Sequence, residues 1–334
     1  MIRILVELPL AESELDPLHR PGVEVRQLPP HTSAWDVPPE FLPGPEVLLC
    51  KLPPRNLDDL PGLKLIQIGT VGYEHLKSHA FARRTIRVCN ARGVFDSAIA
   101  EWNLGMMIAF TRDLRGMLRN QEHAVWERAD RFAQEIRGRV VGLWGYGGIG
   151  RETARLAKAF GMTVHVLTRS GVGPRSYWCP EGTGDPEGTL PDRVFTTAQR
   201  LEFLGGLDFL ILALPHTRES DGLIGPDELQ ALPSRAVVLN PARGPIIQEV
   251  ALLEALRKHR IAGAALDTHF HYPLPADHPL WRFPNVILTP HISGADKSDR
   301  YRPRIASLFA ENVARYQDGR PLLNEVTREE WLGA

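Results

Sequence analysis

The stretch VVGLWGYGGIGRETARLAKAF, residues 140–160, decides how the rest of this chain is organised. It opens with an apolar run that predicts a buried strand and closes with a segment of helical periodicity. Between them stand Gly145, Gly147 and Gly150 in a Gly-x-Gly-x-x-Gly pattern. The first glycine allows a tight turn, the second lets a phosphate approach the backbone, and the third lets the helix pack on the strand. The stretch therefore predicts a site for a dinucleotide pyrophosphate, with the N–H groups of the helix N-terminus facing the anion.

Strand-like runs continue on both sides of this loop and predict parallel sheets of the α/β class. Before it, the runs are IRILVEL, EVLLC (46–50), LKLIQIG (63–69) and IRVCN (86–90), with helical stretches between them. From the loop onward, we expect strands at 140–144, 162–168, 207–214, 236–240, 261–266 and 286–288, and helices at 151–160 and 247–258.

About 140 residues precede the glycine loop, so the dinucleotide-binding domain is predicted to be inserted within another domain. Residues 98–120 predict one long helix as the first connection, and residues 298–317 predict a helix that carries the chain back. We expect two Rossmann-like, doubly wound domains: a dinucleotide-binding domain of 98–294 and a discontinuous, flavodoxin-like domain of 1–97 plus 295–334. Residues 170–193 are rich in Gly and Pro and predict a long loop, either mobile or laid over the adenosine end of the cofactor.

Composition narrows the functional class. Of the 334 residues, 43% are apolar and 24% charged, as in ordinary soluble proteins, and the net charge of −1 gives no general attraction to nucleic acid or anionic lipid. The opening run MIRILVELPL is too short for a signal or membrane segment. Three scattered cysteines argue against a disulfide framework or a metal site. We therefore expect a cytoplasmic protein without bound metal.

Several later segments carry a resemblance to one family. They are IQIGTVGYEHL (66–76), LALPHTRESDGLIG (212–225), VVLNPARGPIIQEVALLEAL (237–256), GAALD (263–267) and HPLWRFPNVILTPHISG (278–294), together with Glu101 and the glycine loop. In order and spacing they resemble the D-isomer-specific 2-hydroxyacid dehydrogenases of the glyoxylate/hydroxypyruvate reductase type. The resemblance implies an active site in the cleft between the two domains, with the flavodoxin-like domain binding a small 2-oxo acid. It also implies a homodimer formed through the dinucleotide-binding domain.

Two side chains suit the reduction of a 2-oxo acid. Arg243 follows the buried run VVLN, at the carboxyl end of a strand, where its guanidinium can bind a carboxylate bidentately. His291 follows VILTP, again at a strand end, and histidine transfers protons near neutral pH. In the resembling family these positions are the substrate arginine and the acid/base histidine. The alternatives are a surface arginine in a turn and a loop histidine bound to backbone.

The resemblance assigns further contacts. Backbone N–H groups of Val71 and Gly72 would bind the substrate carboxylate, and Lys51 would line the same pocket or be a plain surface lysine. Asp267 would contact the nicotinamide carboxamide or ribose, or else be a turn residue. Trp102, Trp281 and Tyr301 either line the pocket or simply pack. The expected cofactor-binding residues are Gly145, Gly147, Gly148, Ile149, Gly150, Thr168, Arg169, Ser170, Leu214, Pro215, Thr217, Pro241, Ala242, Asp267 and Gly294, with His216 close by.

The first departure from the family lies beside the histidine. Relatives usually carry a glutamate five residues after the Asp267 position, and Tyr272 occupies that place here. A tyrosine can orient an imidazole by hydrogen bonding but carries no charge at neutral pH. We therefore expect His291 to be less basic than in the usual pair, so that reduction falls off at a lower pH. His269 or His271 standing in for the carboxylate is an alternative, and a metal bound by this His-x-His pair is a weaker one.

The second departure lies at the cofactor ribose. An NAD enzyme would carry Asp or Glu at the end of strand 162–168, whereas this chain has Thr168-Arg169-Ser170. An arginine and hydroxyls suit a 2′-phosphate, so NADP(H) is predicted to be preferred, with NAD(H) possible. Arg175 is a further candidate for the phosphate, and an exposed turn arginine with weak preference is the alternative.

The predicted function is reversible reduction of a small 2-oxo acid to the D-2-hydroxy acid. A nucleotide-sensing binding protein of the corepressor type is the competing class, because the glutamate is missing. Oxidation of phosphite is a third possibility, although those enzymes usually keep the glutamate.

Overall fold

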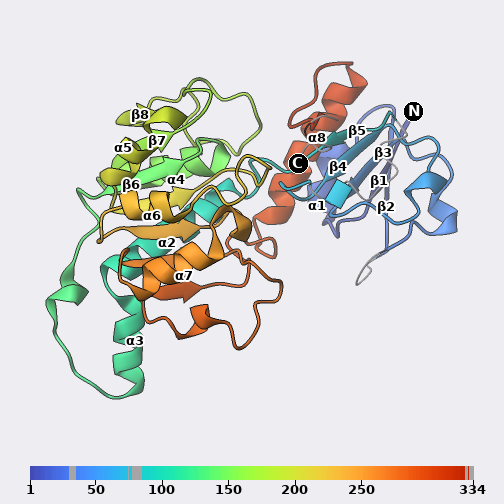
Figure 1. Ribbon diagram of the computed structural model, residues 1–334. Coiled ribbons are helices and arrows are strands. Elements are labelled where there is room, and N and C mark those ends of the chain that lie inside the picture. The colour runs from blue at the N-terminus through green and yellow to red at the C-terminus, as the bar shows by residue number, and fades with distance from the viewer. Residues whose placement is uncertain (30–34, 74, 77–84, 328–329, 331–334) are drawn as a thin grey trace. The chain divides into compact units, whose positions relative to one another are not determined.

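The computed structural model describes residues 1–29, 35–73, 75–76, 85–327 and 330 of the chain (Figure 1). The chain divides into two compact units, each considered below by itself. The first unit comprises Met1–Phe95, Tyr177–Pro180 and Asp296–Ala334, and the second comprises Asp96–Ser176 and Glu181–Ala295. The grouping of Tyr177–Pro180 with the first unit was not predicted from the sequence.

The first unit is built on a five-stranded parallel sheet with the order β2-β1-β3-β4-β5. Its strands are β1 (Ile2–Val6), β2 (Val23–Gln27), β3 (Val47–Cys50), β4 (Leu65–Ile68) and β5 (Arg87–Cys89). This order is that of flavodoxin-like doubly wound sheets. All residues of β3 and β4 are buried, as expected for central parallel strands, whereas the edge strand β2 is only half-buried and was missed in the sequence.

Helical connections between the strands of this unit are short. Within the described residues before β5 they comprise α1 (Glu12–Leu15) and the 3₁₀ turns η1 (Asp16–Leu18), η2 (Pro39–Phe41) and η3 (Leu57–Asp59). Frequent prolines are consistent with these short elements, because proline lacks the N–H that a helix interior requires. The longest helix is α8 (Tyr301–Gln317), close to the predicted 298–317, and Leu308 and Phe309 on it are fully buried in the core of the unit.

The second unit contains a seven-stranded parallel sheet with the order β12-β11-β10-β9-β6-β7-β8. Its strands are β6 (Val140–Trp144), β7 (Thr163–Leu167), β8 (Arg193–Phe195), β9 (Phe209–Leu212), β10 (Val237–Asn240), β11 (Gly263–Leu266) and β12 (Val286–Leu288). The strand order reverses between β6 and β9, so ligands are expected beside the carboxyl end of β6. The predicted fold class, two doubly wound parallel-sheet domains, is confirmed.

Helices cover both faces of this sheet (Figure 1). Along β9, Leu210 packs into the cluster that holds α5 (Arg200–Gly205), α6 (Pro226–Ala231) and α7 (Glu249–Arg257). The next residue, Ile211, packs into the cluster of α2 (Asp96–Thr111) and α4 (Gly148–Ala159). Successive side chains of a strand point to opposite faces, so an uninterrupted apolar run is what a sheet covered on both sides requires.

The prediction of a single helix over 98–120 was wrong. The chain forms α2 and then a separate α3 (Leu114–Glu122). Asp113 between them has a left-handed backbone (φ 46°), and its carboxylate accepts a hydrogen bond from the Gly116 N–H as the cap of α3. Such a cap redirects the chain, although the apolar pattern continues. Further 3₁₀ turns are η6 (Asp130–Ala133), η7 (Thr197–Gln199), η8 (Gly244–Ile246) and η9 (Pro279–Arg282). None of the described helices is both long enough and apolar enough to cross a membrane.

Candidate functional site

The glycine loop has the geometry that the sequence predicted for it. Gly145 has a positive φ of 102°, and a side chain there would collide with the carbonyl of Ala213. A side chain on Gly150 would meet the Gly145 carbonyl at 2.5 Å, whereas Gly147 faces open space. The helix α4 begins at Gly148, three residues earlier than predicted, where the Asp96 carboxylate leaves no room for a side chain. The loop therefore leaves a cradle of backbone N–H groups beside Gly147 that fits a pyrophosphate.

Two further predicted cofactor segments follow strands that flank β6. Thr168, Arg169 and Ser170 come directly after β7, and Leu214, Pro215 and Thr217 come after β9. Arg169 forms an ion pair with Glu219 of the loop after β9. Thr217 is fixed by the hydroxyl of Ser220, which accepts its N–H at 2.7 Å. These segments occupy the carboxyl edge of the sheet on either side of the glycine loop.

The predicted long loop of 170–193 is connected to the glycine loop by hydrogen bonds. These contacts come from the part of the loop that belongs to the second unit. The buried carboxylate of Asp185 accepts a hydrogen bond from the Tyr146 hydroxyl at 2.6 Å and from three backbone N–H groups at 3.0 Å each. Arg151 in the first turn of α4 donates to the carbonyls of Asp185 (2.5 Å) and Gly173 (2.6 Å). This network connects the loop to the residues that would hold the pyrophosphate.

Arg175 lies in the same loop, where its guanidinium donates to the carbonyl of Thr183 at 3.1 Å. This hydrogen bond joins two parts of the loop to each other. The carboxylate of Glu152 on α4 accepts the Gly184 N–H at 2.5 Å and also binds Arg155, so the same part of the loop is fastened to the helix. A contact between Arg175 and a 2′-phosphate stays a prediction.

The proposed catalytic residues come from the three strands at the other end of the sheet. Arg243 follows β10, Asp267 follows β11 and His291 follows β12, and these strands are parallel neighbours. The turn that carries Arg243 is fixed by Asn240, whose amide donates to the Arg243 carbonyl (2.8 Å) and accepts the Ala242 N–H (3.1 Å). The turn includes Pro241 and Ala242, the predicted cofactor contacts. Parallel pairing thus brings three polar side chains, distant in sequence, to one edge.

Asp267 shapes the turn that holds His291. Its carboxylate is fully buried and accepts hydrogen bonds from the Thr289 hydroxyl (2.5 Å) and from the N–H groups of Ile292 and Ser293 (2.9 Å each). Its carbonyl accepts the N–H of His291 at 2.8 Å. His291 itself has a left-handed backbone with φ 56°. The structure thus supports the turn role of Asp267; a contact with nicotinamide stays a prediction, as does that of Gly294.

Tyr272 lies beside His291, with 5.7 Å between the ring centroids and 53° between the ring planes. Its hydroxyl accepts the backbone N–H of His269 at 3.3 Å, and the side chain is 59% exposed. Partial burial raises the pKa of the Tyr272 phenol above its usual value; the nearby Asp267 carboxylate raises it further, while the His269 N–H and the charge of Arg243 oppose the rise. The phenol is therefore neutral at physiological pH. Arg243, Asp267, Tyr272 and His291 form one cluster, hereafter called the catalytic edge after the predicted roles of Arg243 and His291.

The two histidines before Tyr272 have different partners. The Nε2 of buried His269 donates to the Thr289 carbonyl at 2.8 Å. The Nε2 of exposed His271 lies 3.9 Å from Glu249, whose other carboxylate oxygen accepts from Nε2 of His278 at 2.7 Å. These contacts do not favour a metal bound by the His-x-His pair, and Glu249 is a partner that the sequence did not single out.

The predicted substrate residues of the first unit lie in two fixed turns. Asn90 donates to the carbonyl of Val71 at 2.9 Å, and the Thr70 hydroxyl donates to the carbonyl of Gly72 at 2.8 Å. Lys51 follows β3, and its ammonium pairs with Asp296 at 2.7 Å. Their roles toward a substrate stay predictions.

The three aromatic residues predicted either to line the substrate pocket or to pack differ in burial and in their contacts. Tyr301 is buried, donates to the Gly69 carbonyl at 2.9 Å and stacks on Phe95, so it packs within the first unit. Trp102 donates to the Thr289 hydroxyl at 3.2 Å, next to the catalytic edge. Trp281 is half-exposed and donates to the carbonyl of Pro275 at 2.9 Å.

Comparison with known proteins identifies the family that this arrangement belongs to. Residues 104–293 match the model for the D-isomer specific 2-hydroxyacid dehydrogenase, NAD binding domain. The chain is a member of that family. A glyoxylate reductase of Thermofilum pendens is 33% identical over 276 residues, which cover 80% of this chain and 77% of the relative. The predicted family, its dehydrogenase activity and the use of an NAD(P) cofactor are thereby confirmed.

Solved structures agree over almost the whole chain. A D-isomer specific 2-hydroxyacid dehydrogenase family protein from Aeromonas salmonicida is 27% identical, with a TM-score of 0.81 and coverage of 98% of this chain and 99% of that one. A family member from Xanthobacter autotrophicus, solved in complex with NADPH and MES, is 26% identical with a TM-score of 0.75 and the same coverage. This dehydrogenase therefore shares its fold with a protein that holds NADPH.

The Asp185 network predicts a pH-dependent stability. Burial by itself raises the pKa of Asp185, but hydrogen bonds from Tyr146 and three backbone N–H groups outweigh it and hold the pKa below its usual range. The stabilisation is therefore present above about pH 4 and is lost as the pH falls through the folded-state pKa. Asp185→Asn should lower the free energy of unfolding by about 1–3 kcal/mol at pH 7.

Urea unfolding at pH 7 and at a series of lower pH values measures this difference. The gap between the wild type and Asp185→Asn should narrow as the pH falls below about 4. Glu187→Gln, an exposed carboxylate two residues away in the same loop, is the matched control and should unfold like the wild type at every pH. A gap that is independent of pH would contradict the assigned role of the Asp185 charge.

Proposed function

We propose that this dehydrogenase reduces a small 2-oxo acid, of the glyoxylate or hydroxypyruvate type, to the D-2-hydroxy acid with NADPH as the preferred cofactor. The observation that carries the proposal is the catalytic edge, in which an arginine, a histidine and a tyrosine gather at the carboxyl ends of β10, β11 and β12. The glyoxylate reductase of Thermofilum pendens supports the substrate class.

The catalytic edge offers the two functions that this reduction requires. The guanidinium of Arg243 would bind the substrate carboxylate and polarise the adjacent carbonyl. The imidazole of His291 would donate a proton to the developing alkoxide, and its backbone is held for this by Asp267. The bound nicotinamide supplies the hydride. Contacts from Lys51, Val71 and Gly72 to the substrate are part of the same proposal.

The cofactor preference rests on the strand end after β7. Thr168 stands where an NAD enzyme carries a carboxylate, and Arg169 and Ser170 follow it. A guanidinium and hydroxyl groups favour a 2′-phosphate, and the Xanthobacter autotrophicus relative was solved with NADPH. We propose that Arg169 contacts the 2′-phosphate.

A nucleotide-sensing protein of the corepressor type is the second candidate. Tyr272 at the usual glutamate position favours it, because the histidine then lacks the carboxylate that raises its basicity in relatives. Tight NADPH binding without turnover of any 2-oxo acid would support this second function over the first.

Oxidation of NADPH in the presence of a panel of 2-oxo acids, with NADH in parallel, tests the reductase directly. We expect turnover with NADPH, and Arg243→Gln should lower kcat/KM by at least about 100-fold, because it removes the charge that stabilises the transition state. Arg235→Gln is the control, since Arg235 precedes β10 and pairs with Asp208 at 2.6 Å. Equal losses in both variants, or none, would contradict the role of Arg243.

The pH dependence of reduction tests what Tyr272 does. The high-pH limb of kcat/KM should lie below pH 8 in the wild type. Tyr272→Glu should move it upward by about 1–3 pH units, because a neighbouring negative charge favours the protonated imidazole. Tyr272→Phe keeps the ring without the hydroxyl and should leave the limb in place. A wild-type limb at or above pH 8 would refute this interpretation.

We further propose that the chain forms a homodimer through the second unit. Residues 114–133, hereafter the arm, project from this unit (Figure 1). Leu114, Leu118, Val125 and Trp126 on the arm are exposed, and Trp126 is 91% exposed, which is unusual for so large an apolar side chain. A second copy of the chain would bury these side chains.

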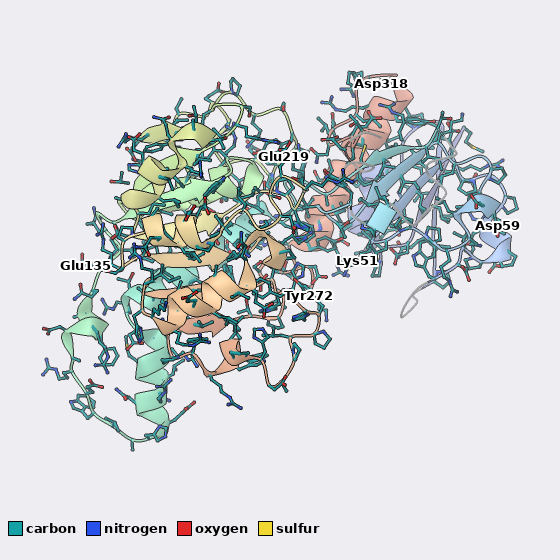
Figure 2. All side chains as sticks on the ribbon, viewed as in Figure 1. Lys51, Asp59, Glu135, Glu219, Tyr272 and Asp318 are labelled. Carbon is teal, nitrogen blue, oxygen red and sulfur yellow. The ribbon has the colours of Figure 1, made fainter. Side chains whose placement is uncertain are left out.

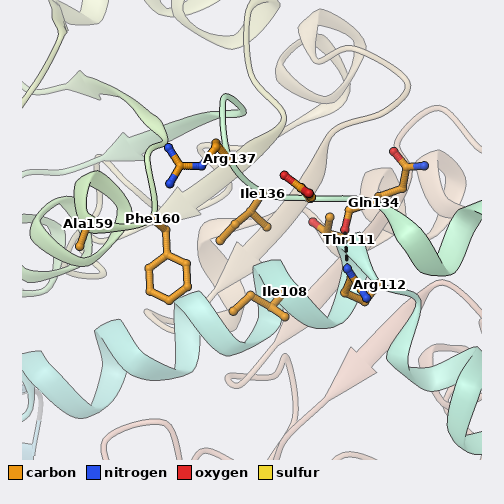
Figure 3. Close-up of a pocket in the computed structure, with 9 residues that line it drawn as sticks. Ile108, Thr111, Arg112, Gln134, Ile136, Arg137, Ala159 and Phe160 are labelled. Carbon is orange, nitrogen blue, oxygen red and sulfur yellow. Dashed lines mark hydrogen bonds between the residues drawn. The ribbon is translucent and has the colours of Figure 1, made fainter.

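A cavity of about 410 Å³ lies at the base of the arm (Figure 3). Apolar side chains of Ile108, Ile136 and Phe160 line it together with Arg112, which donates to the Gln134 carbonyl at 3.4 Å. It lies beside the C-terminal end of α4, away from the glycine loop at the other end of that helix, so we do not assign it to the cofactor. Polar and charged residues, Glu135 and Arg137 among them, also line this cavity, which lies next to the proposed dimer surface.

The double variant Leu118→Glu/Trp126→Glu should convert the dimer to a monomer, because two charges would be buried in the interface. Sedimentation velocity across a range of concentrations measures the change. Val250→Glu alters another strongly exposed apolar residue, on α7, and should leave the dimer intact. A wild-type monomer, or a double variant that sediments like the wild type, would refute the proposed interface.

A further inference from the structure

Glu219 lies in a loop whose backbone is held on both sides. The loop follows β9 and carries Pro215 and Thr217, two of the proposed cofactor contacts. The neighbouring Ser220 is buried, accepts the N–H of Thr217 at 2.7 Å and donates to the carbonyl of Pro215 at 2.8 Å. On the other side of the buried serine, Asp221 pairs with His216 at 2.8 Å. The position of the Glu219 backbone is therefore set by its neighbours.

The Glu219 side chain crosses to the loop after β7 and pairs with Arg169. Both strands border β6, so the pair lies on the carboxyl edge that also holds the glycine loop. The two side chains are 77% and 75% exposed, which leaves room for a third group at the pair. Figure 2 shows Glu219 on a loop of the second unit, to which Tyr272 of the catalytic edge also belongs.

An exposed ion pair of this kind contributes little to folding, typically about 0–1 kcal/mol. The effect of the pair on ligand affinity is larger than its effect on folding, because a 2′-phosphate carries nearly two negative charges. A phosphate that binds Arg169 competes with the Glu219 carboxylate for the guanidinium and lies close to a like charge. A ribose 2′-hydroxyl can instead donate a hydrogen bond to that carboxylate.

We propose that Glu219 is the specificity-determining carboxylate of this cofactor site, supplied by the loop after β9 in place of the missing acidic residue at Thr168. It lowers the affinity for NADP(H) and raises that for NAD(H), so the enzyme accepts both cofactors and Arg169 gives only a moderate preference for NADPH. The inference rests on the proposed binding of the adenosine ribose beside Arg169.

Calorimetric titration with 2′,5′-ADP and with 5′-AMP tests this proposal without turnover. Glu219→Gln should bind 2′,5′-ADP about three- to fivefold more tightly, because the competing charge is gone. It should bind 5′-AMP no more tightly than the wild type does, and the NADPH to NADH ratio of kcat/KM should rise in the same direction. The matched control is Glu202→Gln, since Glu202 forms a similarly exposed pair with Arg193 in the same unit.

A second variant separates this inference from the proposed cofactor preference. If both hold, Arg169→Ala weakens binding of 2′,5′-ADP while Glu219→Gln strengthens it. If Arg169→Ala lowers that affinity but Glu219→Gln leaves both affinities unchanged, the role of Glu219 is refuted and the phosphate site stands. If Arg169→Ala has no effect, the phosphate site itself is refuted, and the role of Glu219 with it.

Discussion

The catalytic edge depends on the hydrogen bonds that the buried carboxylate of Asp267 accepts. This carboxylate accepts hydrogen bonds from one hydroxyl and two backbone N–H groups of the turn after β12. The backbone carbonyl of Asp267 accepts a hydrogen bond from the N–H of His291. A buried polar group is tolerated only when such hydrogen-bond donors surround it, and removing this carboxylate would leave the turn without its acceptor. The left-handed backbone of His291 is maintained by the same contacts. Asp267 thus fixes the turn after β12 and, with it, the backbone position of His291, the proposed acid/base group.

A second buried carboxylate, that of Asp185, also fixes a loop by accepting hydrogen bonds, at the other end of the sheet. Asp185 belongs to the loop that Glu152 and Arg151 also fasten to α4, and the hydroxyl of Tyr146 joins its carboxylate to the glycine loop. Arg151 adds two hydrogen bonds from the first turn of α4. The pyrophosphate cradle is therefore braced from outside the strand–turn–helix unit, and the loop adds to the rigidity that phosphate binding requires.

The sequence predicted the parts of this molecule that follow from local rules. Apolar runs marked the central strands, and the glycine spacing marked the turn before α4, because a side chain at Gly145 or Gly150 would collide with the backbone. It did not predict the break at Asp113, which depends on a single capping side chain, or the edge strand β2. The partners of Arg169, Tyr146 and His278 were also missed. They are brought together by tertiary folding across 29 to 50 residues, and no pattern in the sequence records such pairs.

Tyrosine at position 272 changes the charge balance of the catalytic edge as well as its hydrogen bonding. With a glutamate there, the positive charge of Arg243 would be partly offset next to the incoming carboxylate. The neutral phenol leaves that charge available to an anionic substrate, and the Asp267 carboxylate is already committed to the turn. Binding of a 2-oxo acid should therefore be favoured while retention of the proton on His291 is not. Of these two effects only proton retention depends on pH near neutrality, so under the proposed mechanism we expect reduction to be fastest near or below neutral pH.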